Sequence, residues 1–554
     1  MQQCAVVNKI RQAVLMISIL VGLGSCDIRS SSTEQKLVAD WVIINGKILT
    51  VDNEFTVVEA LAIKDSIILE TGTTQEILLH TDNSTKVTNL KGKTVLPGLI
   101  DNHSHFVRAA KHWYKMVRWD DTYSRKEALS LMEKRSQILP KNEWVVVMGS
   151  FIFEQFKDNN SSFSLEELDS IFPDRPVFIQ EGYSRAFVNT AALKASGFLN
   201  GSNSKYYKDI IANNGILNAG TQAFNIVFKA IPEPSTVVWD KSFSMATDSL
   251  LKMGLTTIVD MGGKTVTPDF YKVVERLVQK NELKIRFFYT LNPQNSTMTS
   301  PEEIQKQLYT NTPNLKDLQF AQFCFGETTY PPMRSSPFQV AEEDLEQFKK
   351  IIIAAVENDW QIHEHSLQEL KVEKMLDVLE EVAEEYPKMK ELRFTIAHTD
   401  GMSKESIQRA IDLEMVFAVH STSRLMTKKQ HEDGLMPPPA SDINELGGLW
   451  GLGSDGTTVA SPNPFHTIGW IVSGNNISGE HLMTQTVSRE DALRAHTSNN
   501  AYLLFKENNL GSIEKGKRAD IIVLNKDYMT VPKGEIKNLY SVMTIVDGRI
   551  MYEL

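Results

Sequence analysis

The middle of the chain alternates short apolar segments with longer amphipathic ones. Short runs rich in β-branched and aromatic residues are typical of buried strands, and the amphipathic stretches between them are typical of helices. Strand–helix units in series form parallel sheets, and eight such units close into a barrel whose active site lies at the carboxyl ends of its strands. The eight strands that we predict are one that ends at His103, followed by 257–259, 285–289, 320–325, 360–362, 394–397, 415–419 and 449–452.

Both ends of the chain predict β-structure instead. Segments 41–44 and 47–51 flank Asn45-Gly46, a pair typical of a tight hairpin turn. Neither end can bury a core alone, so we expect 37–94 and 507–554 to pair into one composite β-sandwich; two separate surface hairpins are the alternative. Further strands are expected at 60–63, 66–69 and 519–524, with a second hairpin over 542–552 that turns at Asp547-Gly548.

The barrel is then expected to occupy 95–506. One interval within it, about 106–250, is too long for a single strand–helix unit. We predict that this interval is an insertion over the barrel mouth, where it shapes the substrate pocket. The expected fold is therefore an α/β protein: a (β/α)8 TIM-type barrel with a large insertion and a small β-sandwich built from both chain ends.

Polar residues stand where the predicted strands end. In a strand, residues two apart project from the same face, so His103 and His105 can point side by side at one metal ion, with Asp101 behind them. Neutral imidazole is a common ligand for a zinc-type ion. A lone His-x-His pair is more often two ordinary polar residues, but three further strand ends carry the same chemistry. These are His365, His398 and Asp455, and only one point of a barrel can receive all five side chains.

Composition excludes several classes of protein. The formal net charge is -11, whereas a nucleic-acid-binding surface is basic. The three cysteines are too few for a disulfide framework or a thiolate metal cluster. With 42% hydrophobic and 23% charged residues, the chain has the composition of a globular enzyme with a deep core.

The first residues predict a targeting signal. Lys9 and Arg11 precede a short apolar stretch, which ends in Leu-Gly-Ser and Cys26. This ending resembles a bacterial lipobox; a plain signal peptide is the alternative, and the run is too short for a membrane span. We expect a signal peptide over 1–25, a lipid on Cys26 and a flexible tether over 26–36. The protein would then be lipid-anchored in the bacterial cell envelope, on the periplasmic face of the inner or outer membrane.

Three segments carry a resemblance to a known superfamily. Residues 95–105, 254–260 and 510–520 resemble the first-strand motif, the second-strand motif and the entry to the closing sandwich of the amidohydrolases. Within that superfamily the chain is most similar to family 3, which contains YtcJ-like proteins and N-substituted formamide deformylase. The resemblance implies a divalent metal, zinc in the first instance, as one or two ions. It implies metal ligation by His103, His105, His365, His398 and Asp455, with Asp455 as general base and His365 as the second catalytic residue.

The chain departs from the family pattern at two places. The fourth strand of the family often carries a carboxylated lysine that bridges two metals, but here Gln322 stands near that position. Glu327 or Cys324 is the alternative ligand, although free cysteines are mostly buried and apolar in behaviour. In the insertion, Ser184 replaces a histidine of the family's substrate-contacting motif, which ends at Asn189. These departures predict an atypical pocket.

The fifth predicted strand offers two histidines. The family pattern favours His365 as the ligand, with Glu369 where a pocket aspartate usually stands. His363 has the same strand parity as His365 and is the alternative ligand.

These features predict a hydrolase of the amide or other C–N bond of a small N-acyl or N-formyl compound, which uses metal-activated water. The alternatives are a cyclic amide, ester or deamination substrate, or an inactive lipid-anchored binding protein on the same fold. The expected partners are a small molecule and, through the lipid, a membrane. Barrels of this kind often dimerise, so a homodimer is one of the expected oligomeric states.

Overall fold

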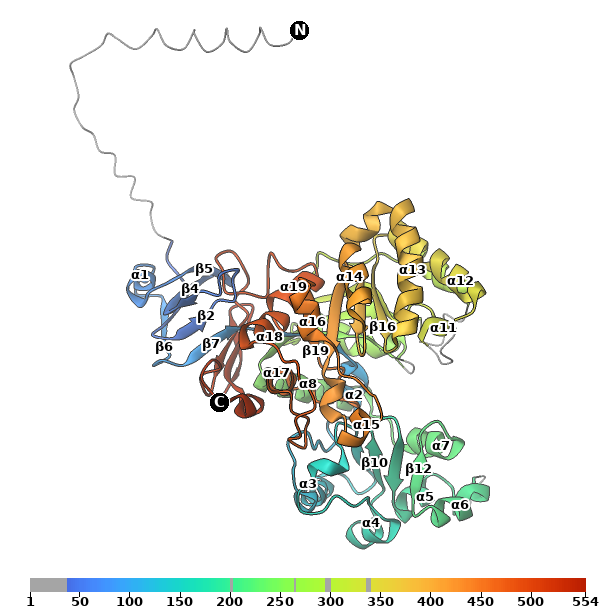
Figure 1. Cartoon of the computed structure of the whole chain (residues 1–554). Coiled ribbons are helices and arrows are strands. Elements are labelled where there is room, and N and C mark those ends of the chain that lie inside the picture. Colours follow the sequence, from blue (N-terminus) through green and yellow to red (C-terminus); the bar gives the residue numbers. More distant parts are fainter. Residues whose placement is uncertain (1–36, 200–202, 264–265, 294–299, 335–339) are drawn as a thin grey trace, which may run out of the picture. The chain divides into compact units, whose positions relative to one another are not determined.

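The computed structural model describes residues 37–199, 203–263, 266–293, 300–334 and 340–554 (Figure 1). The predicted signal peptide, Cys26 and the tether lie outside these residues. Within the part that is described, no helix is both long and apolar enough to cross a membrane.

Eight parallel strands form the central sheet, in chain order around the barrel. The sheet closes where the chain leaves its last strand: the N–H of Asp455 donates to the carbonyl of His103 (2.8 Å), and the N–H of His105 donates to that of Gly456 (2.6 Å). All eight predicted strands are confirmed. They are β8 (Leu99–Ser104), β13 (Leu255–Asp260), β14 (Arg286–Leu291), β15 (Phe320–Glu327), β16 (Gln361–Ser366), β17 (Thr395–His398), β18 (Val416–His420) and β19 (Trp450–Gly453).

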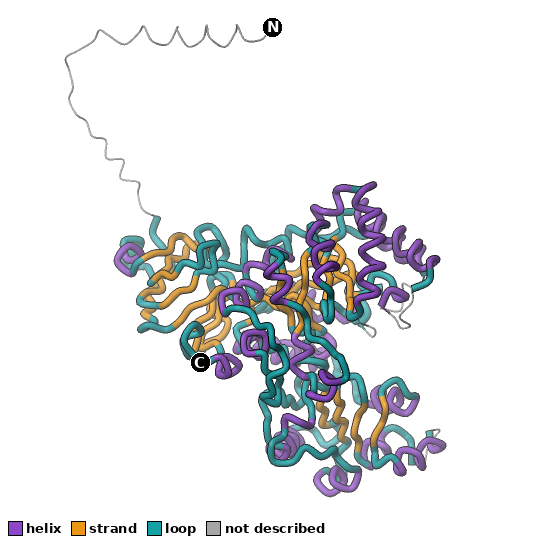
Figure 2. Tube along the Cα trace, viewed as in Figure 1, coloured by secondary structure: helices purple, strands orange, loops and turns teal. Residues whose placement is uncertain are grey.

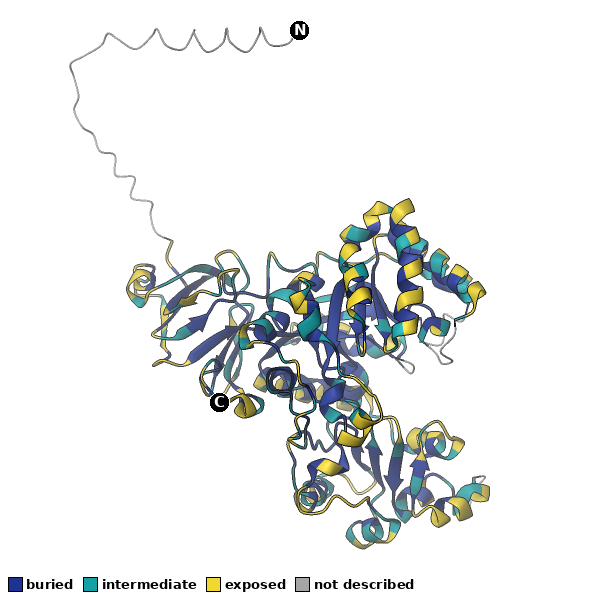
Figure 3. Ribbon diagram, viewed as in Figure 1, coloured by how far each residue is buried: buried dark blue, intermediate teal, exposed yellow. Residues whose placement is uncertain are grey.

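Neighbouring residues of the barrel strands pack on opposite faces, as the two-residue period of a strand requires. Ile258 and Phe287 belong to the core shared with the surrounding helices, whereas Val259 and Phe288 belong to a separate core on the other face. Figure 3 shows the strands buried and the outer sides of α12, α13 and α14 exposed. The helices around the barrel are α8 (Thr236–Lys252), α9 (Lys272–Gln279), α10 (Pro301–Thr310), α11 (Pro331–Arg334), α12 (Glu342–Glu357), α13 (Glu369–Glu385), α14 (Lys404–Asp412), α15 (Lys428–Glu432), α16 (Ala440–Glu445), α17 (Pro464–Ser473), α18 (Arg489–Ala495) and α19 (Ser498–Leu503).

The expected insertion contains its own four-stranded sheet, in the order β12-β11-β10-β9 (Figure 2). It meets the segment that follows β19, where the N–H of Ser150 donates to the carbonyl of Thr458 (2.7 Å). Gly149 is required there, because a Cβ would lie 1.9 Å from that carbonyl oxygen and its φ is +77°. The elements are α2 (Phe106–His112), α3 (Arg125–Ile138), β9 (Val145–Met148), α4 (Leu165–Ile171), β10 (Val177–Glu181), β11 (Arg185–Val188), α5 (Thr190–Ala195), α6 (Tyr207–Ala212), β12 (Ile216–Asn218) and α7 (Gln222–Ala230).

The predicted hairpin at Asn45-Gly46 is wrong. β1 (Trp41–Ile44) pairs with β4 (Ala60–Lys64) and β6 (Lys86–Asn89). β2 (Lys47–Leu49) pairs instead with β3 (Val57–Val58) and β7 (Thr94–Pro97), in another sheet. Asn45 has a φ of 53°, and the N–H groups of Gly46 and Lys47 donate to Glu59 and Lys93. The pair therefore carries the chain from one sheet to the next.

The two chain ends share a sheet, as predicted. β20 pairs antiparallel with β7 in the six-stranded sheet β22-β21-β20-β7-β2-β3, and β21 and β22 form the predicted C-terminal hairpin. Arg286 of β14 ties this sheet to the barrel through a buried ion pair with Asp520 (Nε–Oδ2, 2.7 Å). The remaining elements are β5 (Ile67–Gly72), α1 (Thr74–Leu78), β20 (Ile521–Leu524), β21 (Ser541–Val546) and β22 (Arg549–Glu553).

Candidate metal centre

The first strand places two histidines against two carboxylates. His103 Nε2 lies 3.0 Å from Glu327 Oε2 and 3.7 Å from Asp455 Oδ1. His105 Nε2 lies 3.1 Å from Asp455 Oδ1 and 3.8 Å from Glu327 Oε2. Both carboxylates thus face both imidazoles, Glu327 from the end of the fourth strand and Asp455 from the strand end next to β8.

Two further histidines approach the same carboxylates from the other side. His365 Nδ1 lies 3.6 Å from Glu327 Oε2, and His398 Nε2 lies 3.9 Å from Asp455 Oδ2. The structure therefore brings together all five ligands expected from the sequence, with Glu327 between the two pairs of histidines. Three groups have ligand atoms within 4.8 Å of one another and can each hold an ion: His103, His105 and Glu327; Glu327, His365 and His398; and His103, His398 and His420.

Neighbouring groups orient the first-strand histidines. His105 Nδ1 lies 2.9 Å from the carbonyl of Gly262, so Nδ1 carries the proton and Nε2 is left to face the carboxylates. His103 Nδ1 lies 3.0 Å from His363 Nε2. His363 therefore contacts the expected metal ligand His103. Asp101 accepts bonds from the N–H and hydroxyl of Ser454 (2.9 and 2.6 Å), and burial raises its pKa to about 6.

Mutual attraction between the imidazoles and the carboxylates governs charge at the centre. Burial acts to raise the pKa of Glu327, but His105, His103 and His365 outweigh it and hold this pKa well below its ordinary value. Asp455 behaves in the same way, with a pKa of about 2. Both carboxylates are therefore ionised and available as ligands. Burial lowers the pKa of His398, which favours the neutral imidazole that a metal requires.

Unpaired polar atoms indicate that the cluster is built for an ion. Buried polar atoms without a partner cost roughly 1–3 kcal/mol each, and most proteins avoid them. Here His103 Nε2, Glu327 Oε2, His365 Nδ1 and both ring nitrogens of His398 are buried and make no hydrogen bond within the described structure. Nitrogen and carboxylate oxygen are the donors that zinc-type ions take, so these residues fit a divalent metal.

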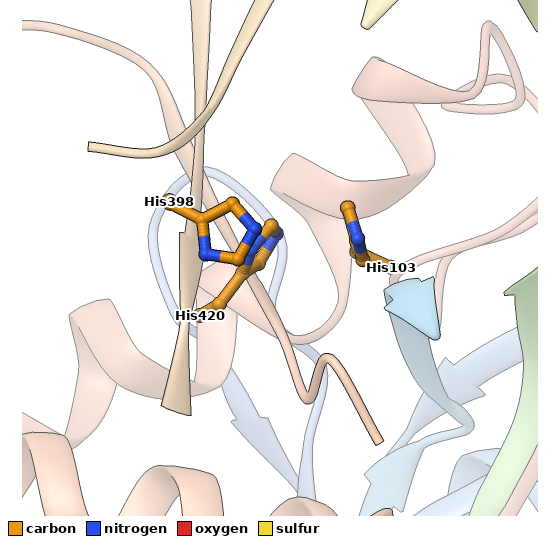
Figure 4. A group of neighbouring side chains, drawn as sticks. All are labelled: His103, His398 and His420. Atoms are coloured by element: carbon orange, nitrogen blue, oxygen red, sulfur yellow. The ribbon is translucent and has the colours of Figure 1, made fainter. Parts of the chain in front are cut away.

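His420 is a site residue that the sequence interpretation missed. It ends β18, its ring centroid lies 4.0 Å from that of His103 and 4.4 Å from that of His398, and both of its ring nitrogens are buried without a hydrogen bond (Figure 4). The signal was present, because His420 directly follows the predicted strand 415–419 and stands at the same strand end as the other ligands.

Two of the expected pocket residues are structural instead. Asn189 is fully buried: its amide oxygen accepts from the N–H groups of Val177 and Ala192, and its amide nitrogen donates to two carbonyls. Glu369 accepts from the N–H of Ser403 and the hydroxyl of Ser406, at the start of α14. Both side chains use their polar atoms on backbone groups and on the start of a helix, and neither belongs to the groups that can hold an ion.

The other residues that depart from the family pattern lie in a surface turn, along β15 and in the apolar core of the barrel. Ser184 is exposed in the β10–β11 turn and donates to the carbonyl of Glu181. Gln322 pairs with Tyr289 in the first half of β15, further from the carboxyl end than Glu327. Cys324 is buried in the apolar core of the barrel, where burial raises the pKa of its thiol, and it belongs to none of the three groups that can hold an ion. Of the alternatives to the missing lysine, Glu327 is the one that reaches the cluster.

Comparison with known proteins supports the same reading of the fold. The model of the amidohydrolase family (Amidohydro_3) matches residues 86–552. The amidohydrolase-like protein YtcJ of Bacillus subtilis is 24% identical over 92% of this chain and 98% of its own length. The N-substituted formamide deformylase of Arthrobacter pascens is 23% identical over 93% of this chain and 98% of its own. A solved structure described as an uncharacterised metal-dependent hydrolase from Pyrococcus furiosus superposes with a TM-score of 0.62, at 20% identity, over 88% of this chain and all of that one.

Proposed function

Because this chain belongs to the amidohydrolase family, and is thereby a metal-dependent hydrolase, we propose that it cleaves the amide or another C–N bond of a small N-acyl or N-formyl compound. The observation that carries the proposal is the position of Glu327 and Asp455 between the two histidine pairs at the carboxyl end of the barrel, where all of these side chains are buried except the half-buried His365. The name of the Arthrobacter relative supports the choice of a C–N bond.

Glu327 would take the place of the bridging lysine. Its Oε2 faces both His103 and His365, so one carboxylate oxygen can serve two neighbouring ions. His103, His105 and Glu327 would hold one ion, and Glu327, His365 and His398 would hold the second. A divalent ion bound there would polarise the scissile carbonyl and lower the pKa of its bound water to about 7.

Asp455 is the residue that we assign to proton transfer. It is ionised and lies beside His105 and His398, so it can orient the attacking water, take its proton and return that proton to the leaving amine. His365 has its Nδ1 toward Glu327, which leaves Nε2 to donate to the oxyanion of the tetrahedral intermediate. Together these two side chains supply the proton and the oxyanion contact that amide hydrolysis needs.

The test is metal analysis of the purified protein together with a substrate panel of N-formyl and N-acetyl amides, cyclic amides, esters and deaminable rings. We expect one or two zinc-type ions per chain, with the ion at His103 and His105 lost in a His103→Ala/His105→Ala double variant, and turnover confined to the open-chain amides. Turnover of only the esters or only the rings would show that the protein does not cleave open-chain amides and would assign it to that other substrate class. A folded protein that takes up no metal and turns over nothing would favour a binding protein on this fold.

We also propose that the protein is held in the cell envelope by a lipid on Cys26. The support is the charged and apolar leader before that cysteine. Metabolic labelling with palmitate in a bacterial host should mark the wild-type chain and leave a Cys26→Ala variant unlabelled and released from membranes. Equal labelling of both chains would contradict the proposal.

A further inference from the structure

We propose that Arg108, held in place by Tyr183 of the insertion, binds a carboxylate of the substrate, which makes the substrate an N-acyl amino acid or a close relative. This inference rests on the proposed function, since it names the substrate class of the same site. It is carried by the position of the guanidinium, the absence of a described carboxylate in contact with it, and its contact with the insertion.

Arg108 lies directly beside a metal ligand. It stands in the first turn of α2, three residues after His105. Gly263 separates the two side chains: a Cβ on this glycine would lie 3.4 Å from Arg108 Nη1 and 3.5 Å from His105 Nδ1. The φ of Gly263 is +123°, so the backbone conformation calls for glycine. The guanidinium therefore lies near the imidazole of His105, with Gly263 beside both side chains.

The guanidinium has no carboxylate of the described residues in direct contact. Arg108 is only partly exposed, yet no carboxylate of the described residues lies within 4.0 Å of it. The nearby carboxylate of Asp260 is already engaged, because it accepts from the N–H groups of Val107 and Gly262 and from the hydroxyl of Tyr271. Against the effect of burial, the carboxylates of Asp455 and Glu327 raise the pKa of Arg108 from a distance, so the guanidinium is charged, but no described carboxylate is in contact with it. A half-buried arginine of this kind can take an anion at its free donors.

The insertion supplies the one hydrogen-bond partner that the described residues offer to the guanidinium. Arg108 Nη2 donates to the hydroxyl of Tyr183, which lies in the β10–β11 turn with 57% of its surface exposed. This bond uses one of five N–H donors and fixes the plane of the fork. The other donors remain for a two-oxygen ligand, and a carboxylate matches the geometry of a guanidinium fork.

The charge around the centre favours an anion as well. Arg334 approaches the second oxygen of Glu327, with Nη1 3.4 Å from Oε1. One divalent ion would balance the charge of Glu327 and Asp455 and two would exceed it, and in either case the two arginines would add positive charge. Such a field draws an anionic substrate and disfavours a cationic one. An amide carbonyl at the centre and a carboxylate at Arg108 are the two ends of an N-acyl amino acid.

The test compares N-acetyl and N-formyl amino acids with their own carboxamides, which differ only in the charge. Zinc-loaded protein is titrated with each member of a pair by calorimetry, and hydrolysis is followed separately. Charge-assisted hydrogen bonds are worth about 1.5–3 kcal/mol, so we expect the acids to bind roughly 10- to 100-fold more tightly than the carboxamides. This ratio should fall to near one in Arg108→Met and to an intermediate value in Tyr183→Phe.

Arg108→Lys keeps the charge without the fork and should retain only part of the preference. Arg549→Met removes an exposed arginine of β22, beside the residues Leu283 and Ile285 that lead into β14, and should leave the ratio as in the wild type. Zinc content and circular dichroism show whether each variant is folded. Equal binding of acids and carboxamides by the wild type, or an unchanged ratio in Arg108→Met, would overturn the inference.

The two proposals fail differently. Equal hydrolysis of acids and carboxamides leaves amide hydrolysis standing and removes the carboxylate site. Acids that bind through Arg108 without being hydrolysed leave the carboxylate site standing and remove amide hydrolysis.

Discussion

Nε2 of His103 and Oε2 of Glu327 lie 3.0 Å apart, and both side chains are buried. The two residues are brought together from the first and fourth strands of the barrel. Neither atom makes a hydrogen bond, although His103 Nδ1 is paired with His363. An ion between them would satisfy both atoms at once. Because Glu327 also belongs to the group formed with His365 and His398, its carboxylate would determine whether the centre holds one ion or two.

Substitution of Glu327 by Gln removes the charge that the two groups of histidines share. We expect the number of ions per chain to fall by one, because a neutral amide cannot bridge two cations. The measurement is plasma mass spectrometry of protein reconstituted with zinc. Gln322→Ala is the matched control on the same strand and should keep the wild-type stoichiometry; two ions in Glu327→Gln would exclude the bridging role.

Asp455→Asn keeps the size of the side chain and removes its ability to take a proton. We expect turnover to fall by roughly 10²- to 10⁴-fold, the contribution typical of general acid–base groups, while zinc remains bound by the histidines. Initial rates on the best substrate, together with zinc content, check this. An Asn variant with near wild-type turnover would remove Asp455 from proton transfer.

His363 is expected to act through His103. Its Nε2 lies 3.0 Å from His103 Nδ1, and loss of such a partner of a metal ligand typically weakens metal affinity about 10- to 100-fold. His363→Leu should therefore show a weaker zinc Kd in competition with a chromophoric chelator, with kcat restored by excess zinc. A kcat that stays low at saturating zinc would instead make His363 a group that contacts the substrate.

His496 should make the fold acid-sensitive. It donates from Nδ1 to the carbonyl of Ile100 (3.1 Å), its Nε2 is buried without a partner, and burial lowers its pKa to about 4. Because the unfolded chain binds the proton more readily, stability is complete above pH ~6.5 and is lost as the pH falls toward about 4. The shift corresponds to about 3 kcal/mol in full and to about 2 kcal/mol near pH 5.

The matched control is His496→Gln, which keeps a donor and does not titrate. Urea unfolding of both chains, in the presence of a chelator, should show a difference in acid sensitivity of about 2 kcal/mol between about pH 7.5 and about pH 5. Parallel pH profiles for the two chains would show that His496 is not the group responsible.

The sequence by itself determined the barrel and much of its centre. The spacing and length of the apolar segments identify the eight strands. In a barrel of parallel strands, functional polar residues gather at the carboxyl ends of those strands. From that rule alone, His103, His365 and Asp455 were expected in one place, and the structure brings them together. The C-terminal hairpin at Asp547-Gly548 was also legible, because its turn and its strands are local.

Only the tertiary structure decided the remaining features. Asn45-Gly46 has a hairpin sequence, yet its neighbours find their hydrogen bonds in distant strands and divide between two sheets. Asn189 has the polarity of a pocket residue, but a helix start and two carbonyls take all of its polar atoms. Which residue replaces a missing ligand, as Glu327 does, depends on how far each strand runs into the barrel mouth. Hydrogen bonds and side-chain directions at strand ends are set by partners far away in the chain, and local sequence does not encode them.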